Sequence, residues 1–349
     1  MESLRMVLIF TYFFKIQIIK MIQKPIVHYI FFLVILSCIL VSCNSGNTDP
    51  LSKYLYNEGT VYGPYKIYQL PITKGVNILN PIQIAIGPGQ KLFGANQTGE
   101  VYVIRDSDGD GLEDEAALYC NISDQGLRSP AGFAFRGDTV YIGASQEIRA
   151  YLDKNKDGIA DTSWVFFNDI PHSEHPYEWT SGLCFGPDGW LYCSLTTDSW
   201  NPGASPDPKG YRGSLIRIAP DGKSSERIAS GLRSVYGIAF HPDGDLFFVD
   251  NEGGGNPTEE LNLFERDKFY GHNGKKFPGH DSTRLPVLDL HVEVAPSGIE
   301  FNNASNNFGE GSDDLYIAYY GPGERWNRGA VARVNMHKKE NGLYVLQEY

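Results

Sequence analysis

Two short acidic segments of this chain carry the same pattern of possible metal ligands. Residues 106–114 have the sequence DSDGDGLED and residues 153–161 have DKNKDGIAD, so both fit D-x-[DN]-x-D-G-x-x-D. In a tight turn, alternate side chains converge on one cation, the glycine allows the sharp bend, and the next residue offers its carbonyl oxygen. The predicted calcium ligands are Asp106, Asp108, Asp110, Leu112 and Asp114 in the first acidic loop, and Asp153, Asn155, Asp157, Ile159 and Asp161 in the second.

An exposed acidic hairpin that only adds solubility is the alternative interpretation of each loop. The neighbouring carboxylates of the first loop would repel one another unless a cation lay between them. The loop also occurs twice, at equivalent points of the repeat described next. We therefore expect both loops to bind calcium as a structural ion that holds a long hairpin turn.

The elements that carry these loops belong to a repeat of roughly 50–60 residues. Five segments each combine an alternating apolar run, a turn rich in proline, aspartate and glycine, and a second alternating run, which is the pattern of a β-hairpin. A period of this length is typical of one four-stranded blade per repeat in a β-propeller, whereas the repeats of a solenoid, the alternative, are usually shorter. The central apolar residues of the five segments are Ile84, Phe133, Leu183, Ile238 and Ile299.

We predict an all-β chain whose residues 80–349 form a six-bladed β-propeller. Five blades are clear in the sequence. Because a ring must close to avoid open strand edges, the sixth blade is expected either to be composite, with strands from residues 43–79, or to be truncated. Residues 43–79 are otherwise expected to form a tether and the first strands.

The first 42 residues have the features of a bacterial export signal. After Met21, a basic residue precedes an apolar run over residues 30–41, and residues 40–43, LVSC, resemble a lipobox. The run is short for a membrane-spanning helix, which is the alternative, and a polar stretch follows at once. We expect residues 1–42 to be a signal region with its true start at Met21, and Cys43 to carry a lipid. The mature protein would then lie in the bacterial cell envelope, facing the periplasm or the cell surface, and contact the membrane through this lipid.

Charge and cysteine content narrow the possible partners. The formal net charge of -12 argues against nucleic acid, whose phosphates need a basic surface, and suits bound cations and neutral substrates.

Besides Cys43, the mature chain keeps Cys120, Cys184 and Cys193. An odd number of cysteines gives no disulfide framework, so we expect them to be small buried side chains.

The fourth repeat resembles a known family. Residues 231–274 have the sequence GLRSVYGIAFHPDGDLFFVDNEGGGNPTEELNLFERDKFYGHNG. This is similar to the glucose/sorbosone dehydrogenase family, six-bladed propellers related to soluble quinoprotein glucose dehydrogenase, with the run G-x-R-N-x-x-G-[LI]-A-F-x-P-D-G-x-L, an acidic glycine-rich loop, E-[IL]-N and a G-x-x-Y-G-W-P ending. The late repeat from APSGIEF to WNRGAVARV is also similar. The resemblance covers residues 80–349 at the level of repeats.

The resemblance implies pyrroloquinoline quinone (PQQ) on one face of the propeller, with a calcium ion beside it. An arginine at the start of the family's run can polarise a quinone carbonyl, and a second can bind a carboxylate through its planar fork. An inter-blade salt bridge is the alternative role of the first. The residues implied at the cofactor are Arg233, Ser234 (where the family has asparagine), Arg328 and, in the acidic glycine-rich loop, Glu252, Gly253 and Gly254.

Two family residues have changed. The catalytic histidine of the family falls on Glu178, a carboxylate that can act as a base if burial raises its pKa. His175 lies three residues earlier and is a second candidate base, and His172 is a weaker one. The family lysine would fall near Asn302 or Asn303, so it is absent here.

Two functions are therefore expected from the sequence. The first is a lipid-anchored dehydrogenase that oxidises a sugar or related alcohol or aldehyde with PQQ and passes electrons to an acceptor that the sequence does not identify. The second is a non-catalytic propeller that keeps calcium and binds a glycan or another partner, since a fold alone does not fix function.

Overall fold

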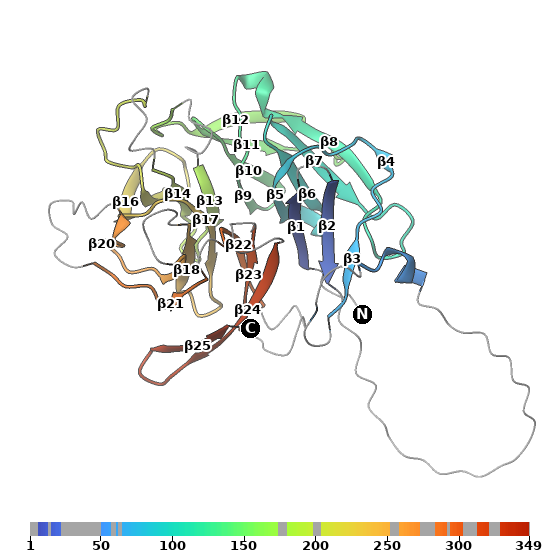
Figure 1. Ribbon diagram of the computed structural model, residues 1–349. Coiled ribbons are helices and arrows are strands. Elements are labelled where there is room, and N and C mark those ends of the chain that lie inside the picture. The colour runs from blue at the N-terminus through green and yellow to red at the C-terminus, as the bar shows by residue number, and fades with distance from the viewer. Residues whose placement is uncertain are drawn as a thin grey trace, which may run out of the picture.

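The protein is described by a computed structural model, and the described residues are 6–12, 15–21, 50–56, 61, 65–173, 180–197, 204–251, 258–272, 283–291, 294–302, 313–320 and 329–348. Within them, five sheets of four consecutive or nearly consecutive strands follow one another along the chain (Figure 1). The first strands of successive sheets contact one another, β5 with β9, β9 with β13, β13 with β17 and β17 with β22. These strands are therefore the inner strands of the blades of a β-propeller.

The strands of the five blades are as follows. Blade 1 has β5 (Pro81–Ile86), β6 (Leu92–Asn96), β7 (Glu100–Arg105) and β8 (Glu115–Asn121), and blade 2 has β9 (Gly132–Arg136), β10 (Thr139–Gly143), β11 (Ile148–Leu152) and β12 (Thr162–Phe167). Blade 3 has β13 (Thr180–Phe185), β14 (Leu191–Leu195), β15 (Ser214–Ile218) and β16 (Ser225–Ser230). Blade 4 has β17 (Val235–Phe240), β18 (Leu246–Asp250), β19 (Glu260–Leu263) and β21 (Leu288–Asp289), and blade 5 has β22 (Pro296–Phe301), β23 (Leu315–Tyr319), β24 (Ala330–Lys338) and β25 (Tyr344–Glu348).

Two short strands and three 3₁₀ helices lie outside the four main strands of each blade. Strand β4 (Lys74–Gly75) adds in parallel to β8, and β20 (Lys268–Phe269) leaves blade 4 and adds in parallel to β16 of blade 3. These additions cover the outer strands of blades 1 and 3, which would otherwise present unpaired edges. The helices are η1 (Pro50–Tyr54), η2 (Pro88–Gln90) and η3 (Ile122–Gln125).

The five anchor residues predicted from the sequence occupy the same place in five blades. Each lies in an inner strand opposite a residue of the second strand, in the pairs Ile84–Gly94, Phe133–Ile142, Leu183–Cys193, Ile238–Phe248 and Ile299–Ile317. All five pairs belong to antiparallel hairpins. The repeat read from the sequence is therefore the blade repeat, and the all-β propeller is confirmed.

Neighbouring inner strands approach so closely that a side chain is excluded at some positions. A Cβ atom added to Gly132 would lie 2.5 Å from the carbonyl oxygen of Ser181, and one added to Gly237 would lie 2.7 Å from the amide nitrogen of Ile299. Both contacts cross from one blade to the next. Glycine at these positions lets the blades pack backbone against backbone around the centre.

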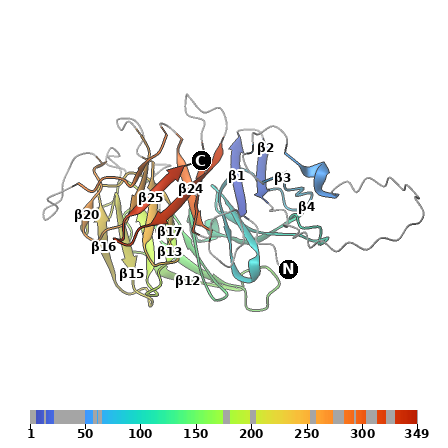
Figure 2. The same ribbon diagram turned by 90° about the horizontal axis from the view of Figure 1, so that it is seen from below.

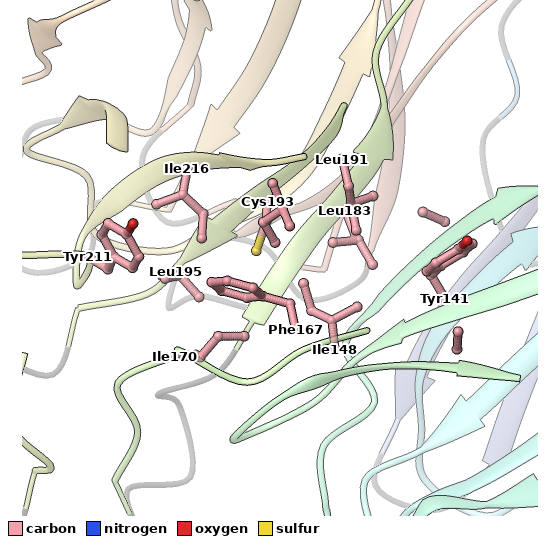
Figure 3. Packing of buried hydrophobic residues seen from close by; sticks show 13 residues of the cluster. Tyr141, Ile148, Phe167, Ile170, Leu183, Leu191, Cys193, Leu195, Tyr211 and Ile216 are labelled. Atoms are coloured by element: carbon pink, nitrogen blue, oxygen red, sulfur yellow. The ribbon is translucent and has the colours of Figure 1, made fainter. Parts of the chain in front are cut away.

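The hydrophobic core lies between the blades rather than in one central layer. Figure 3 shows the cluster between blades 2 and 3, where Phe167 and Ile148 of blade 2 pack against Leu183, Cys193 and other residues of blade 3. The second strands β6, β14 and β18 are buried at every residue. Neighbouring blades cover both faces of β14 and β18, whereas blade 2 and the segment before blade 1 cover the two faces of β6. The three cysteines of the described residues are free, and burial raises the pKa of each thiol. Cys193 is buried as expected, whereas Cys120 and Cys184 are half-buried.

The segment before blade 1 lies between the first and the last blade. Strand β3 (Ile67–Gln69) forms a three-stranded sheet with β1 (Met6–Tyr12) and β2 (Lys15–Met21), and β1 lies beside β5 (Figures 1 and 2). The Tyr65 and Tyr316 hydroxyls are 2.9 Å apart, so this segment also contacts blade 5. A sheet of three strands is not a blade of four, and the predicted sixth blade stays a prediction.

The predicted signal region is only partly covered by the described residues. Residues 6–12 and 15–21 form the β1–β2 hairpin, whereas the lipobox with Cys43 lies outside the described residues. Among the described residues, none belongs to a helix whose length and apolar character would let it cross a bilayer. The boundaries at residues 42, 43, 79 and 80 stay predictions.

Candidate functional site

The two acidic loops occupy equivalent turns in neighbouring blades. The first, residues 106–114, joins the third and fourth strands of blade 1, and the second, residues 153–161, joins those of blade 2. Because strands alternate in direction, both loops lie on the face where the inner strands end, here called the exit face. Each loop is a long hairpin turn at the rim, as the sequence predicted.

The first acidic loop is organised by its own carboxylates. Asp106 accepts hydrogen bonds from the backbone N–H of Gly109 at 2.7 Å and of Gly111 at 2.8 Å, and Asp110 accepts one from Leu112 N at 2.8 Å. One carboxylate oxygen from each of Asp106, Asp108 and Asp110 lies within 4.8 Å of the others. These bonds turn the backbone so that three acidic side chains gather at one place, which is the arrangement a calcium loop requires.

The second loop repeats these hydrogen bonds with different residues. Asp153 accepts from Asp157 N at 3.2 Å and from Gly158 N at 2.8 Å, and Asp157 accepts from Ile159 N at 2.8 Å. The two loops also share their backbone turns. The sixth position has φ +100° at Gly111 and +96° at Gly158, a left-handed conformation that favours glycine, as predicted.

The last residue of each acidic loop, Asp114 or Asp161, accepts hydrogen bonds from a different set of donors. In the first loop, Asp114 Oδ1 accepts from Ser107 N at 2.7 Å, and Oδ2 accepts from Ser107 Oγ at 2.9 Å and from the Lys74 ammonium at 2.6 Å. The hydrogen bond from Lys74 and those from Ser107 lower the pKa of Asp114 to about 2. In the second loop, Asp161 Oδ2 accepts from the backbone N–H of Lys154 at 2.6 Å and of Asn155 at 3.2 Å. A lysine from β4 therefore competes for a predicted calcium ligand in the first loop only.

The predicted cofactor arginine lies on the opposite face. Arg233 and Ser234 directly precede the inner strand β17, so they lie on the face where the inner strands begin, here called the entry face. The carboxylate of Asp250, which is fully buried, accepts from Arg233 N at 2.9 Å and from Ser234 N at 2.7 Å. The Arg233 guanidinium donates through Nη1 to the carbonyl oxygen of Asn251 at 2.6 Å and to its Oδ1 at 3.0 Å. Together, Asp250 and Asn251 fix both the backbone and the side chain of this arginine.

Ionisable groups gather around Asp250. Burial raises the pKa of Glu260 to about 7, although a hydrogen bond from Asn262 partly opposes this, and the charge of Asp250 adds to the increase. Burial lowers the pKa of His272, the Asp250 charge opposes this, and the Arg233 charge adds to it. His272 is thus favoured as a neutral imidazole. The sequence signal for it was the end of the fourth repeat, where histidine stands at the tryptophan position of the family pattern.

The entry face also carries a cavity of about 210 Å³ that the sequence analysis did not predict. Its walls are residues 168–172, which follow blade 2, and residues 205–211, which lie between β14 and β15 of blade 3. His172, the weaker base candidate, lines it together with Asp169 and Lys209, whose charged groups form an ion pair. The only sequence signal was the polar, proline- and glycine-rich composition of the second wall.

One arginine holds the two walls of this cavity together. Arg212 donates to the carbonyl oxygen of Ser205 at 2.8 Å and to that of His172 at 3.1 Å. Ser205 and His172 also exchange hydrogen bonds, with His172 N donating to Ser205 Oγ and Ser205 N to His172 O, both at 2.8 Å. The cavity is therefore preformed by hydrogen bonds rather than by loop packing alone.

Of the remaining predicted site residues, Asn302 belongs to the described part of the chain, and the others lie outside it. Asn302, near which the family lysine was expected, has 5% of its surface exposed, and its backbone N–H donates to Asp314 O at 2.8 Å. Of the two residues near which the lysine was expected, Asn302 and Asn303, only Asn302 is among the described residues, and its side chain is neutral. The residues that lie outside the described part of the chain are His175, Glu178, Glu252, Gly253, Gly254, Asn303 and Arg328.

The fold and the two faces define this protein as a β-propeller with acidic turn loops on one face and, on the other, a half-buried arginine next to a buried aspartate. A family model with the description "Domain of unknown function (DUF7133)" matches residues 79–308, so the chain belongs to this family. An uncharacterised protein of Borreliella burgdorferi is 30% identical over 132 residues. That match covers 33% of this chain and 34% of the relative, about a third of its length.

Solved structures of sugar dehydrogenases have a similar fold. The PQQ-bound aldose sugar dehydrogenase of Streptomyces coelicolor is 21% identical, with a TM-score of 0.55, over 80% of this chain and 83% of that one. The holo form of the pyranose dehydrogenase PQQ domain of Coprinopsis cinerea is 14% identical, with a TM-score of 0.59, over 78% of this chain and 79% of that one. At these identities the similarity shows the fold. The resemblance to glucose dehydrogenase-like propellers is thereby confirmed for the architecture.

Proposed function

We propose that this protein is a quinoprotein-type dehydrogenase that oxidises a sugar or a related alcohol or aldehyde at the entry face of the propeller. The observation that carries the proposal is the placement of Arg233 at the start of β17, where Asp250 fixes its backbone and Asn251 its guanidinium. An arginine held in this way needs no reorganisation when negative charge develops on a bound group. The electron acceptor is a separate partner that we leave unassigned.

The described residues fit PQQ in part. Arg233 supplies a rigid cation for an anionic or carbonyl oxygen, and His272 supplies a neutral imidazole within electrostatic reach of that cation. Bound PQQ would supply the acceptor for the hydride of the substrate. The proton of the substrate hydroxyl would pass to a base of this chain, for which Glu178 and His175 are the proposed residues. Arg328 and the loop with Glu252, Gly253 and Gly254 are proposed as further contacts of the cofactor and its calcium ion.

The cavity of about 210 Å³ on the same face is proposed as the place where part of the substrate binds. A carboxylate, an ammonium group and a serine hydroxyl line it, and these groups can exchange hydrogen bonds with sugar hydroxyls. Because Arg212 already holds its walls, binding there would cost little ordering of the loops.

Calcium in the two acidic loops is proposed to act on structure and not on the chemistry. Both loops lie on the exit face, whereas Arg233 lies on the entry face. A cation in each loop would remove the repulsion among its carboxylates and hold the turn between the outer strands. The lipid at Cys43 and the location in the bacterial cell envelope are also proposed, on the sequence of residues 40–43.

A second function is favoured by the position of Asn302. Asn302 lies near the place where the glucose/sorbosone dehydrogenase family has a lysine, and a neutral residue there weakens the case for PQQ. A propeller that binds a glycan without oxidising it would need only the cavity and the calcium loops. The two proposals differ in whether the protein binds PQQ.

A PQQ titration of the purified protein, with calcium and with chelator, tests the proposed dehydrogenase. We expect a change in quinone absorbance with calcium present, and reduction of an electron-accepting dye when aldoses are added. Arg233→Lys should weaken PQQ binding because it keeps the charge and loses the fork that bonds Asn251. Arg266→Lys is the matched control, because Arg266 follows β19 and pairs with Glu226 away from the cavity. A protein that binds aldoses but never PQQ would favour the second function.

A further inference from the structure

A second cavity, of about 130 Å³, lies on the exit face between blades 1 and 2. Its apolar part is formed by Phe93 and Val103 of blade 1 and Val140 of blade 2. Five polar or charged residues also line it: Asp153, the first residue of the second acidic loop, Tyr119 of β8, and Lys91, Asp138 and Lys156. A predicted calcium ligand and a tyrosine from the neighbouring blade therefore border the same small space.

The hydroxyl of Tyr119 is exceptional among the buried tyrosines. The residue is 2% exposed, and within the described part of the chain its hydroxyl has no hydrogen-bond partner. By contrast, the buried hydroxyl of Tyr151 donates to Gln125 at 2.8 Å, and that of Tyr102 donates to Glu100 at 2.7 Å. Burying a hydroxyl without a partner is costly, so native proteins usually provide a ligand or an ordered water for it.

Tyr119 is also tied to the second acidic loop. Its carbonyl oxygen accepts from the backbone N–H of Ala160 at 2.9 Å, and its ring packs edge-on against Phe93 with centroids 5.1 Å apart. Burial chiefly raises the pKa of Tyr119, and the charges of Asp153 and Asp161 add to this. The phenol is therefore a protonated donor held in a fixed position beside two predicted calcium ligands.

We propose that Tyr119 completes the cation site of the second acidic loop, its hydroxyl donating to water that hydrates a calcium ion bound by this loop. The cavity has room for several waters, and a loop with four side-chain ligands leaves part of the calcium shell to water. The inference rests on the proposed binding of calcium to this loop. In the first loop, Lys74 contacts the closing residue Asp114, so the two loops differ in the side chains that contact them despite their similar sequences.

The experiment measures calcium binding and stability in the full chain. Calorimetric titration is done on a parent in which Asp108→Asn and Asp110→Asn disable the first loop, so that the second loop is observed alone. Tyr119→Phe in this parent should raise the calcium Kd roughly three- to tenfold, the effect of one lost hydrogen bond. In chelator, its melting temperature should stay unchanged or rise, because the variant removes a buried hydroxyl that has no partner.

Tyr151→Phe is the matched control, since it removes a hydroxyl that bonds Gln125 and does not border the cavity. It should lower the melting temperature in chelator and leave the calcium Kd unchanged. If the parent binds calcium and Tyr119→Phe leaves the Kd unchanged, the role of Tyr119 is wrong while calcium binding stands. If Tyr119→Phe lowers the melting temperature in chelator as Tyr151→Phe does, its hydroxyl has a protein partner and the role is again wrong. A parent that binds no calcium overturns both the role of Tyr119 and the proposed calcium site.

Discussion

Asp250→Asn should destabilise the propeller and loosen the predicted cofactor arginine. The two oxygens of Asp250 accept from two buried backbone N–H groups, Arg233 N at 2.9 Å and Ser234 N at 2.7 Å. An asparagine offers one oxygen and one NH₂ group, so one of the two N–H groups would face another donor. These bonds form the turn that leads into the inner strand β17, so the change acts at the centre of blade 4.

The size of the effect follows from the two bonds. Losing one hydrogen bond to a charged group and leaving one buried N–H unpaired costs about 2–4 kcal/mol together. For a domain of this size that is a fall in melting temperature of roughly 3–7 °C. Differential scanning fluorimetry in calcium measures it, with Asp221→Asn as control, because Asp221 is exposed and accepts a turn bond from Lys223 N at 3.0 Å. A fall below about 2 °C in Asp250→Asn, or one equal to that of the control, would refute the proposed role of this carboxylate.

Three further predictions follow from single contacts. Lys74→Met should raise the calcium affinity of the first acidic loop roughly two- to fivefold, because it removes the ammonium that competes for Asp114; calorimetry on a chain with the second loop disabled would show no gain if this contact does not compete. Glu260 has a folded pKa of about 7 against 4.5 in the unfolded chain, so the folded state binds the proton more tightly and stability falls as pH rises from 4.5 to 7. In Glu260→Gln this loss, at most on the order of 3 kcal/mol, should disappear. Urea unfolding measures the difference in unfolding free energy between the two proteins, and a difference that is the same at pH 5 and pH 8 would contradict the prediction. Gly237→Ala should cost about 1–3 kcal/mol, because the added Cβ would lie 2.7 Å from Ile299 N, and an unchanged melting temperature would mean that the blades can move apart.

The sequence predicted well those features that depend on neighbours along the chain. The turn positions of both acidic loops follow from residues only a few positions apart, and Gly111 and Gly158 adopt the left-handed conformation expected of them. The blade repeat is also local, because each hairpin is encoded by its own alternating run and turn. The anchors Ile84 and Phe133 accordingly lie in equivalent pairs of neighbouring blades.

The closure of the propeller ring was harder to predict from the sequence. Six blades were predicted, and the five that were clear in the sequence are present, whereas the segment between blade 5 and blade 1 contains the three-stranded sheet β1–β3. Its contacts, such as Tyr65 with Tyr316, join residues 251 positions apart. No local pattern of residues specifies a pairing at that distance, so the sixth blade remained open in the sequence analysis.

By itself, the sequence determined the propeller class, the number of clear blades and the two acidic loops, because each of these rests on short-range spacing. Only the tertiary structure decided what surrounds them. In the folded chain, the Lys74 ammonium bonds the Asp114 carboxylate, and Asp250 accepts a hydrogen bond from Arg233 N. Tyr119 lines the same cavity as Asp153 of the second loop. These contacts join separate strands or separate blades, and they depend on how the blades pack around the ring rather than on any pattern within one repeat.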